Sequence, residues 1–171
     1  MSPKRPWLPL AFLVLITACS GEQLTVDLEQ ERAEILSLYE GNRSCLLDGD
    51  VDLCMSRYAV DVDEYVAVFE GEIAKLNRSE LDGDWRAALE TREYSEVNIL
   101  APPEIHLSAD GSMAWGVIKA ELKYTKTTPD GQRSDRVLVA AALTVFEKRG
   151  PDWVEVAMAE TGSPVEGQAG M

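Results

Sequence analysis

Three turn signals in the second half of the chain constrain its fold more than any other feature. They are Asp110-Gly111, residues 129–131 (Pro-Asp-Gly) and residues 149–152 (Arg-Gly-Pro-Asp), and they separate segments rich in β-branched and alternating apolar residues. An Asp-Gly pair between such segments is a strong hairpin signal. Because short connections join strands that run in opposite directions, residues 94–161 are predicted to form an antiparallel meander.

The first half of the chain has helical periodicity instead. From Asp27 onward one helical stripe collects Leu28, Ile35, Tyr39, Asn42 and Leu46. Gly49 can adopt the left-handed conformation after this helix, and Asp50 can cap a short helix over residues 51–58. The first helix therefore ends at a tight turn, and the second helix turns back on it.

The middle of the chain completes an α+β pattern. Residues 64–76 begin as a strand, and their second half fits either a strand or a helix, while residues 79–93 predict a third helix. Along residues 113–124, alternation places small and apolar side chains on one face: Ala114, Gly116, Ile118, Ala120, Leu122 and Tyr124. Helices can pack closely on that face or leave a hollow. Helices followed by a meander predict an α+β domain.

The N-terminal segment has the layout of a secretory signal peptide. Basic Lys4 and Arg5 precede an apolar run over residues 7–16, and small residues stand before Cys19. The apolar run is too short to span a bilayer as a helix, which takes about 20 residues. Residues 16–19 (Ile-Thr-Ala-Cys) resemble the bacterial lipobox. The alternative is an ordinary signal peptide, or a membrane helix with a chance cysteine.

The lipobox resemblance implies that the thiol of Cys19 carries diacylglycerol and that the chain is cut just before this residue. Several acyl chains make a stable membrane anchor. Ser20 follows where an aspartate would indicate retention at the inner membrane, so the resemblance implies a lipid-anchored envelope protein, at the outer membrane and facing the periplasm in a Gram-negative cell. The predicted parts are a signal peptide (1–18), a lipidated tether (19–26), one domain (27–161) and a flexible tail (162–171).

The charge of the chain excludes some partners. The 171 residues carry a net charge of −14, and removing residues 1–18 leaves 153 residues with a charge of −16. Such acidity argues against nucleic acid, whose phosphates need basic side chains, and against contact between the domain body and anionic lipid. The 46% of hydrophobic residues argues against a disordered chain.

Two cysteines remain once Cys19 is assigned to the lipid. Cys45 and Cys54 form an even pair in an oxidising compartment, which favours a disulfide. A bridge over this short loop stabilises the fold by roughly 2–3 kcal/mol. The alternative is two buried free thiols on packed helices.

The order of these parts resembles the nuclear transport factor 2-like superfamily in its SnoaL-like branch. The segments that carry the resemblance are residues 35–62, with a long helix, a Gly-Asp turn and a short helix; residues 107–125; and residues 144–162. The resemblance implies helices packed in a curved antiparallel sheet, a cystatin-like cone with one pocket. Isomerases, dehydratases, cyclases and non-catalytic binding modules share this fold, so the fold leaves the function open.

Enzymes of this superfamily use a pocket carboxylate as base with a tyrosine or a protonated acid at the oxyanion. Asp61 and Asp63 follow the short helix where such acids can lie, and Tyr39 or Tyr58 can supply the hydroxyl. The alternative is that both acids lie in a solvated turn and that both tyrosines fill the core.

The last strand lacks a feature that relatives often have. Relatives often place histidines that face the cavity in this strand, whereas residues 153–159 read "WVEVAMA" and put Ala157 and Ala159 at those positions. The single histidine, His106, has no nucleophile motif beside it. An exposed or hydrogen-bonded strand histidine is the preferred interpretation.

Metal and cofactor sites find little support in the sequence. One histidine and no Cys-x-x-Cys motif exclude the usual zinc spacings. Residues 48–52 (Asp-Gly-Asp-Val-Asp) begin like a calcium loop but lack the glycine and the final acid that such a loop needs. Glycine-rich phosphate loops are absent from the sequence. We expect neither a metal nor a cofactor.

The remaining candidates are aromatic. Trp85 and Trp115, with Tyr39 and Tyr58, can line an apolar pocket, although core packing explains them equally well. The leading hypothesis is an exported lipoprotein whose domain binds a small apolar ligand or an envelope partner protein without catalysis. The alternatives are an isomerase- or cyclase-like enzyme that uses a pocket Asp and Tyr, and a module that forms a homodimer through its open sheet face.

Overall fold

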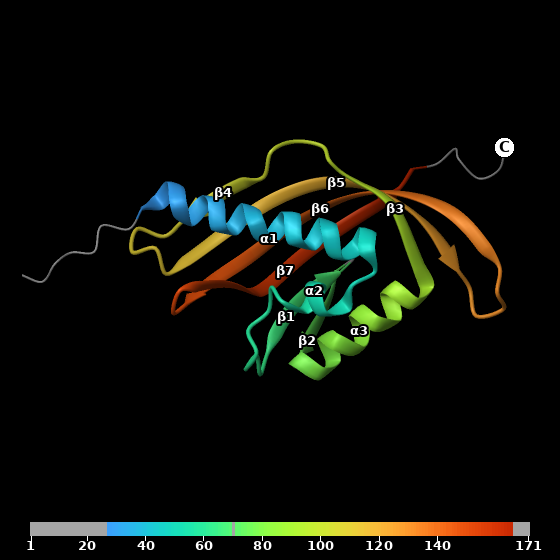
Figure 1. Ribbon diagram of the computed structural model, residues 1–171, viewed down its shortest axis with the longest axis horizontal. Helices are drawn as coiled ribbons and strands as arrows, with labels where there is room; N and C mark the ends of the chain where they lie inside the picture. The colour runs from blue at the N-terminus through green and yellow to red at the C-terminus, as the bar shows by residue number, and fades with distance from the viewer. Residues whose placement is uncertain (1–26, 70, 166–171) are drawn as a thin grey trace, which may run out of the picture.

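The computed structural model describes residues 27–69 and 71–165. The predicted signal peptide, the tether with Cys19 and residues 166–171 of the predicted tail lie outside the described residues. Helices precede most of the strands, as Figure 1 shows. The helices are α1 (Leu28–Asp48), α2 (Val51–Met55) and α3 (Arg78–Thr91). The strands are β1 (Tyr65–Phe69), β2 (Glu72–Leu76), β3 (Arg92–Ile99), β4 (Glu104–Leu107), β5 (Met113–Thr127), β6 (Arg133–Arg149) and β7 (Asp152–Pro164).

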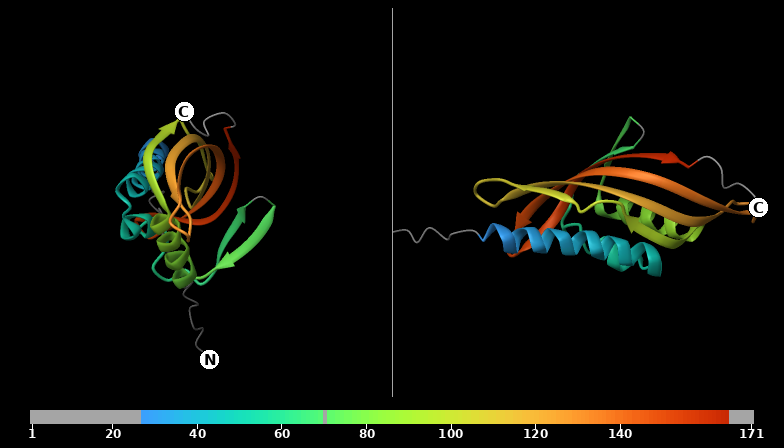
Figure 2. Two further views of the ribbon diagram at one scale, coloured as in Figure 1. Left: turned by 90° about the vertical axis from the view of Figure 1, so that its right-hand side faces the viewer. Right: turned by 90° about the horizontal axis from the view of Figure 1, so that it is seen from above.

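The strands form one curved sheet in the order β2-β1-β7-β6-β5-β3, and β4 pairs with β5. The predicted meander is confirmed for β5, β6 and β7, which pair antiparallel along nearly their whole length. The sheet is not wholly antiparallel, because β1 runs parallel to β7 from Val66 opposite Ala157 to Phe69 opposite Glu160. Figure 2 shows that the sheet curls without closing and that the β1–β2 hairpin projects from it. The predicted α+β class, with helices packed in a curved sheet, is confirmed.

Local signals explain where most elements begin and end. The side chain of Asp27 accepts hydrogen bonds from the first turn of α1, Gly49 adopts a φ of 66° after its last turn, and Asp50 caps α2. The second half of residues 64–76 is a strand, and Gly71, with a φ of 88°, supplies the reversal that the hairpin needs. Three bounds differ from expectation: α2 ends at Met55, α3 ends at Thr91 so that Arg92 and Glu93 belong to β3, and β7 runs to Pro164.

A disulfide joins Cys45 at the end of α1 to Cys54 in α2, with the two Cα atoms 5.2 Å apart. Both residues are fully buried and pack with Leu46 of α1 and Val97 of β3. The bridge closes a nine-residue separation and holds the short helix against the long one. The bridge thereby helps to position Arg57 and Tyr58, which follow the C-cap of α2.

The helices cover one side of the sheet, here called the inner face. Ala114 and Gly116 of β5 are buried under α1, whereas Met113, Trp115 and Val117 are exposed on the outer face, as alternation predicts. The approach at Gly116 is especially close: a Cβ added there would lie 2.5 Å from the hydroxyl oxygen of Tyr39. Glycine at this position therefore lets α1 pack against β5.

We expect Gly116→Ala to lower the free energy of unfolding by about 1–3 kcal/mol, because the added methyl group overpacks the core against Tyr39. Gly83→Ala is the matched control, since nothing lies within 4 Å of the added Cβ in α3. The control should leave stability unchanged or raise it by up to about 1 kcal/mol. Urea denaturation measures both, and equal effects at the two positions would contradict this account.

Candidate functional site

The two predicted catalytic acids lie on the surface. Asp61 and Asp63 are exposed in the segment between α2 and β1, and Asp61 Oδ1 accepts a hydrogen bond from Arg149 Nη1 at 3.0 Å. The residue between them, Val62, is buried in the core. Because Val62 takes the inward position, its two neighbours point outward. The structure therefore does not place either acid as a base facing the interior.

The two predicted tyrosines are buried but belong to different clusters. Tyr39 packs edge-on against Phe146, its hydroxyl has no hydrogen-bond partner among the described residues, and burial raises its pKa to about 12. Tyr58 Oη accepts hydrogen bonds from Arg57 Nη2 at 2.7 Å and from Trp85 Nε1 at 3.3 Å. Burial also raises the pKa of Tyr58. Both hydroxyls are therefore neutral at physiological pH.

An ion pair that the sequence analysis missed lies beside Tyr58. Arg57 Nε is 3.4 Å from Glu155 Oε2, both side chains are almost fully buried, and Tyr65 donates a hydrogen bond to Glu155. The backbone N–H of Glu155 also donates to the Arg57 carbonyl at 2.8 Å. Burial raises the pKa of Glu155, while Arg57 and Tyr65 oppose that shift. Burial disfavours the charged form of Arg57, but the combined interactions with Glu155, Tyr58 and Tyr65 outweigh this cost and raise the pKa of Arg57.

A β-bulge explains why Ala157 and Ala159 do not face the interior. In β6 and β7, Phe146 pairs with Glu155 and Val145 pairs with Ala157, so Val156 is an extra residue in β7. The bulge reverses the alternation: Glu155 lies on the inner face before it, and Val156, Met158 and Glu160 lie on that face after it. Ala157 and Ala159, expected toward the interior, therefore lie on the outer face. Simple alternation along the sequence could not reveal this reversal.

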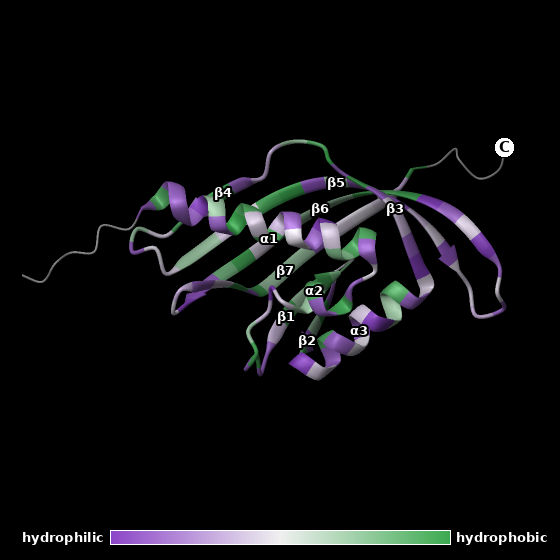
Figure 3. Ribbon diagram, viewed as in Figure 1, coloured by the Kyte–Doolittle hydropathy of each residue, from purple (hydrophilic) through white to green (hydrophobic). Residues whose placement is uncertain are grey.

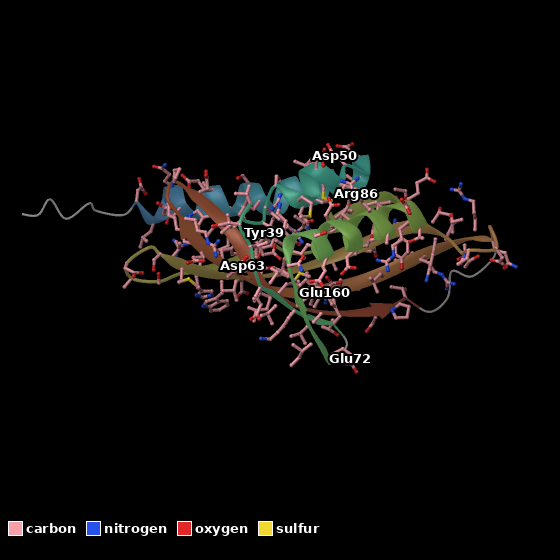
Figure 4. The ribbon with its side chains drawn as sticks, turned by 90° about the horizontal axis from the view of Figure 1, so that it is seen from below. Tyr39, Asp50, Asp63, Glu72, Arg86 and Glu160 are labelled. Carbon is pink, nitrogen blue, oxygen red and sulfur yellow. A yellow bond between two sulfur atoms is a disulfide. The ribbon has the colours of Figure 1, made fainter. Side chains whose placement is uncertain are left out.

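Beyond the bulge the inner face is only partly covered. The side chains of Ala120, Leu122, Leu138 and Ala142 on β5 and β6, here called the apolar floor, are half-buried and share this face. Glu160 of β7 pairs with Ala142 and is half-buried near the middle of the molecule, whereas Glu72 lies at the tip of the β1–β2 hairpin (Figure 4). Burial raises the pKa of Glu160, and Arg57 and Arg92 oppose that shift.

The two predicted pocket tryptophans do not meet. Trp85 of α3 lies on the inner side, where the guanidinium carbon of Arg57 is 5.2 Å from its ring centre. Trp115 lies on the outer face, 43% exposed, and stacks on His106 with the ring centres 3.9 Å apart. Odd-numbered residues of β5 point away from the helices, so Trp115 cannot line the same site as Trp85. His106 is exposed beside it.

Two surface hollows accompany these sites. The first, of about 670 Å³, lies around Trp115, and it is lined mainly by apolar residues of β4, β5 and β6: Leu107, Met113, Ala114, Leu143 and Val145. The second, of about 680 Å³, lies between α1, the 58–61 segment and the β6–β7 turn. Tyr58 and Asp61 both line the second hollow, but the hydroxyl of Tyr58 is engaged by Arg57 and Trp85. Within the described residues no hydrogen bond joins Asp61 to Tyr58, and Asp61 is instead bound to Arg149.

Within residues 27–69 and 71–165, no helix is long and apolar enough to cross a membrane. Nor do three or more His, Cys, Asp or Glu side chains gather there in a group that could hold a metal ion.

We expect Arg57→Met to lower the free energy of unfolding by about 3–5 kcal/mol, because it leaves the Glu155 carboxyl buried without its partner. The loss should be larger at pH 8 than at pH 5. In the folded variant burial raises the pKa of Glu155, whereas in the unfolded chain this carboxyl ionises in its ordinary range, so a rise in pH favours the unfolded state. Urea denaturation at pH 5 and pH 8 measures both effects. The double variant Arg57→Met/Glu155→Leu should recover most of the loss, and no recovery would contradict the role of the pair.

Solved structures with the same fold are numerous, although no protein-family model and no curated protein matches the sequence. A nuclear transport factor 2-like superfamily protein from Salmonella enterica serovar Typhimurium is 16% identical, with a TM-score of 0.62 over 82% of this chain and 96% of that one. A conserved protein from Planctomyces limnophilus is 17% identical, with a TM-score of 0.62 over 80% and 99%.

A third solved structure is described provisionally as a dehydratase. This protein of the nuclear transport factor 2-like family from Streptomyces avermitilis is 12% identical, with a TM-score of 0.58 over 81% of this chain and 99% of that one. At these identities the likeness establishes the fold alone. The domain has the nuclear transport factor 2-like, cystatin-like fold that the sequence predicted.

Proposed function

We propose that this chain is an exported, membrane-anchored lipoprotein whose nuclear transport factor 2-like domain binds a small, largely apolar ligand without catalysis. The observation that carries the proposal is the apolar floor, which lies on the helix-bearing face of the curved sheet and yet remains half-buried. Binding sites for small molecules are concave and mostly apolar, with a few polar groups that set orientation. Glu160 is such a polar group on the same face.

The geometry supports binding over catalysis. A general base must reach the proton that it removes, and Asp61 and Asp63 are exposed on the surface instead. Glu155 is fully buried in an ion pair with Arg57 and accepts a hydrogen bond from Tyr65, so its carboxylate is held in the core. The likeness to a protein described as a dehydratase extends to the fold, which many functions share. An isomerase- or cyclase-like enzyme therefore remains the weaker alternative.

The lipid anchor sets where the domain works. Seven residues separate Cys19 from Asp27 and span at most about 25 Å when fully extended. The domain would therefore act close to the membrane surface of the cell envelope, at the periplasmic side of the outer membrane in a Gram-negative cell. A ligand of mainly apolar character is consistent with that location.

A second candidate function is assembly through the outer face. Met113, Trp115, Val117 and Leu143 are large apolar side chains that the fold leaves 38–43% exposed. Contiguous apolar patches on a soluble domain mark interaction surfaces. A second copy of the chain, or an envelope partner protein, would cover this patch.

We expect Cys19→Ser to move the protein from the membrane fraction to the soluble fraction of fractionated cells, because the hydroxyl is too poor a nucleophile to accept the lipid. Mass spectrometry of the unchanged protein should show acyl chains on its N-terminal cysteine. If the Cys19→Ser protein stays in the membrane fraction, or if Cys19 carries no lipid, the proposal that Cys19 anchors the protein is wrong.

For ligand binding, we expect native mass spectrometry of the Cys19→Ser chain to show a retained small molecule. Ala142→Phe should abolish retention, because it fills the inner face, whereas Ala141→Phe should not, because the adjacent residue of β6 points to the outer face. Thermal unfolding checks that both variants fold. An empty monomer would overturn ligand binding, and an empty dimer would favour the second candidate function.

A further inference from the structure

Three basic residues cluster at one end of the inner face. Within residues 27–69 and 71–165, five Lys and Arg side chains form no ion pair with a carboxylate of the described chain: Arg78, Arg92, Lys119, Lys126 and Arg136. Arg78 instead donates to the carbonyls of Tyr58 and Ala59. The other four include Arg92, Lys126 and Arg136, here called the basic end.

The strand register brings the basic end together. Arg92 of β3 is the cross-strand partner of Lys126 in β5, and Tyr124, two residues before Lys126, is the partner of Arg136 in β6. Cross-strand partners share a face and lie about 5 Å apart. Tyr94 joins them, because its ring centre is 5.3 Å from that of Tyr124. Three cations thus surround two tyrosine rings.

The basic end is continuous with the apolar floor. Tyr124 and Arg136 form one cross-strand pair of β5 and β6. The next pair on the same face, Leu122 and Leu138, belongs to the apolar floor, so the floor begins directly beside the basic end. Figure 3 shows the same change along the β5–β6 hairpin, which is hydrophobic toward α1 and hydrophilic at its free end. The face therefore has a charged end and an apolar middle.

This end of the inner face is positively charged, although the whole chain is acidic. The protein carries −14, and yet its inner face concentrates three cations that no described carboxylate pairs with. Nearby acids point elsewhere: Glu93 pairs with Arg133, and Asp135 accepts from Thr125, both on the outer face. Glu160 is the carboxylate of this face that interacts with Arg92, and it lies inward at the level of Ala142.

Arginine also has the geometry that anion recognition needs. The guanidinium carbon of Arg92 is 5.8 Å from the ring centre of Tyr124, so the ring supports the side chain while its N–H groups stay free of carboxylates. A planar guanidinium matches the two oxygens of a carboxylate or a phosphate. A polyanion such as nucleic acid is disfavoured, because the rest of the chain would repel it.

We infer that the basic end binds the single anionic headgroup, carboxylate or phosphate, of an amphiphilic ligand whose apolar part lies on the apolar floor. This inference rests on the proposed function, since it assigns a ligand class to the same face. Arg92 and Arg136 contact the headgroup, Lys126 adds charge, and Tyr94 and Tyr124 separate the headgroup from the floor.

The experiment measures binding of four probes to the Cys19→Ser chain by calorimetry: octanoate, octyl phosphate, octan-1-ol and inorganic phosphate. We expect the two charged amphiphiles to bind at least about tenfold more tightly than octanol or inorganic phosphate, because only they use both parts of the site. Their affinity should fall as salt is added.

Matched variants locate the headgroup. Arg92→Gln and Arg136→Gln should each weaken octanoate binding about tenfold and leave octanol unchanged. Lys119→Gln is the control, because Lys119 also lacks a carboxylate partner but lies on the outer face of β5 opposite Ala141, and it should change affinity less than twofold. Thermal unfolding confirms that each variant is folded.

The possible outcomes separate this inference from the proposed function. Equal affinity for octanol and octanoate would overturn the headgroup site while leaving apolar binding in place. If inorganic phosphate binds as tightly as octyl phosphate, the basic end is a site for free anions, and the inference that it binds an amphiphilic ligand is overturned. Binding of none of the four probes would overturn both the headgroup site and the proposed function.

Discussion

The buried pair of Arg57 and Glu155 connects the two halves of this fold. Arg57 follows α2 and Glu155 lies in β7, so the ion pair and the hydrogen bond between their backbones join the helical half to the sheet, and Tyr65 of β1 donates a further hydrogen bond to Glu155. Charges in such a place are costly unless each meets a partner. Arg57 is held in position by the disulfide between α1 and α2 and by the packing of Trp85 against its guanidinium group.

This connection also shapes the inner face. The bulge at Val156 directly follows Glu155, and it turns Met158 and Glu160 inward while Ala157 and Ala159 turn outward. Without the bulge, Ala157 and Ala159 would follow Glu155 on the inner face of β7, and Glu160 would lie on the outer face. The bulge therefore places Glu160 on the candidate ligand face. The same strand thus serves the stability of the fold and the polarity of the site.

The two faces of the sheet differ in what they offer. The inner face combines an apolar floor with a basic end, which suits a molecule that has an apolar part and one negative charge. The outer face presents Met113, Trp115, Val117 and Leu143 without such a charge cluster and suits a protein surface. Both uses are compatible in one molecule, because β-strand alternation separates their side chains.

Local chemistry made much of the fold predictable from sequence. Asp50, Gly49 and the Asp110-Gly111 turn act through their nearest neighbours, and the alternation from Ala114 to Tyr124 holds because β5 runs without a bulge in that stretch. Cys45 and Cys54 were near enough in sequence for their pairing to be a reasonable expectation. The sequence before Cys19 that resembles a lipobox is also a local signal, and it lies outside the described residues.

The candidate site depended on tertiary structure. Asp61 and Asp63 looked catalytic by position, but burial of Val62 turned them outward, and Trp115 lies across the sheet from Trp85. Arg57 and Glu155 are far apart in the sequence, as are Arg92, Lys126 and Arg136. The sequence by itself determined the elements, the turns and the alternating faces, because these follow from neighbouring residues. Only the tertiary structure decided which charges meet, because pairing register, the bulge and the curl of the sheet arise from contacts between distant strands.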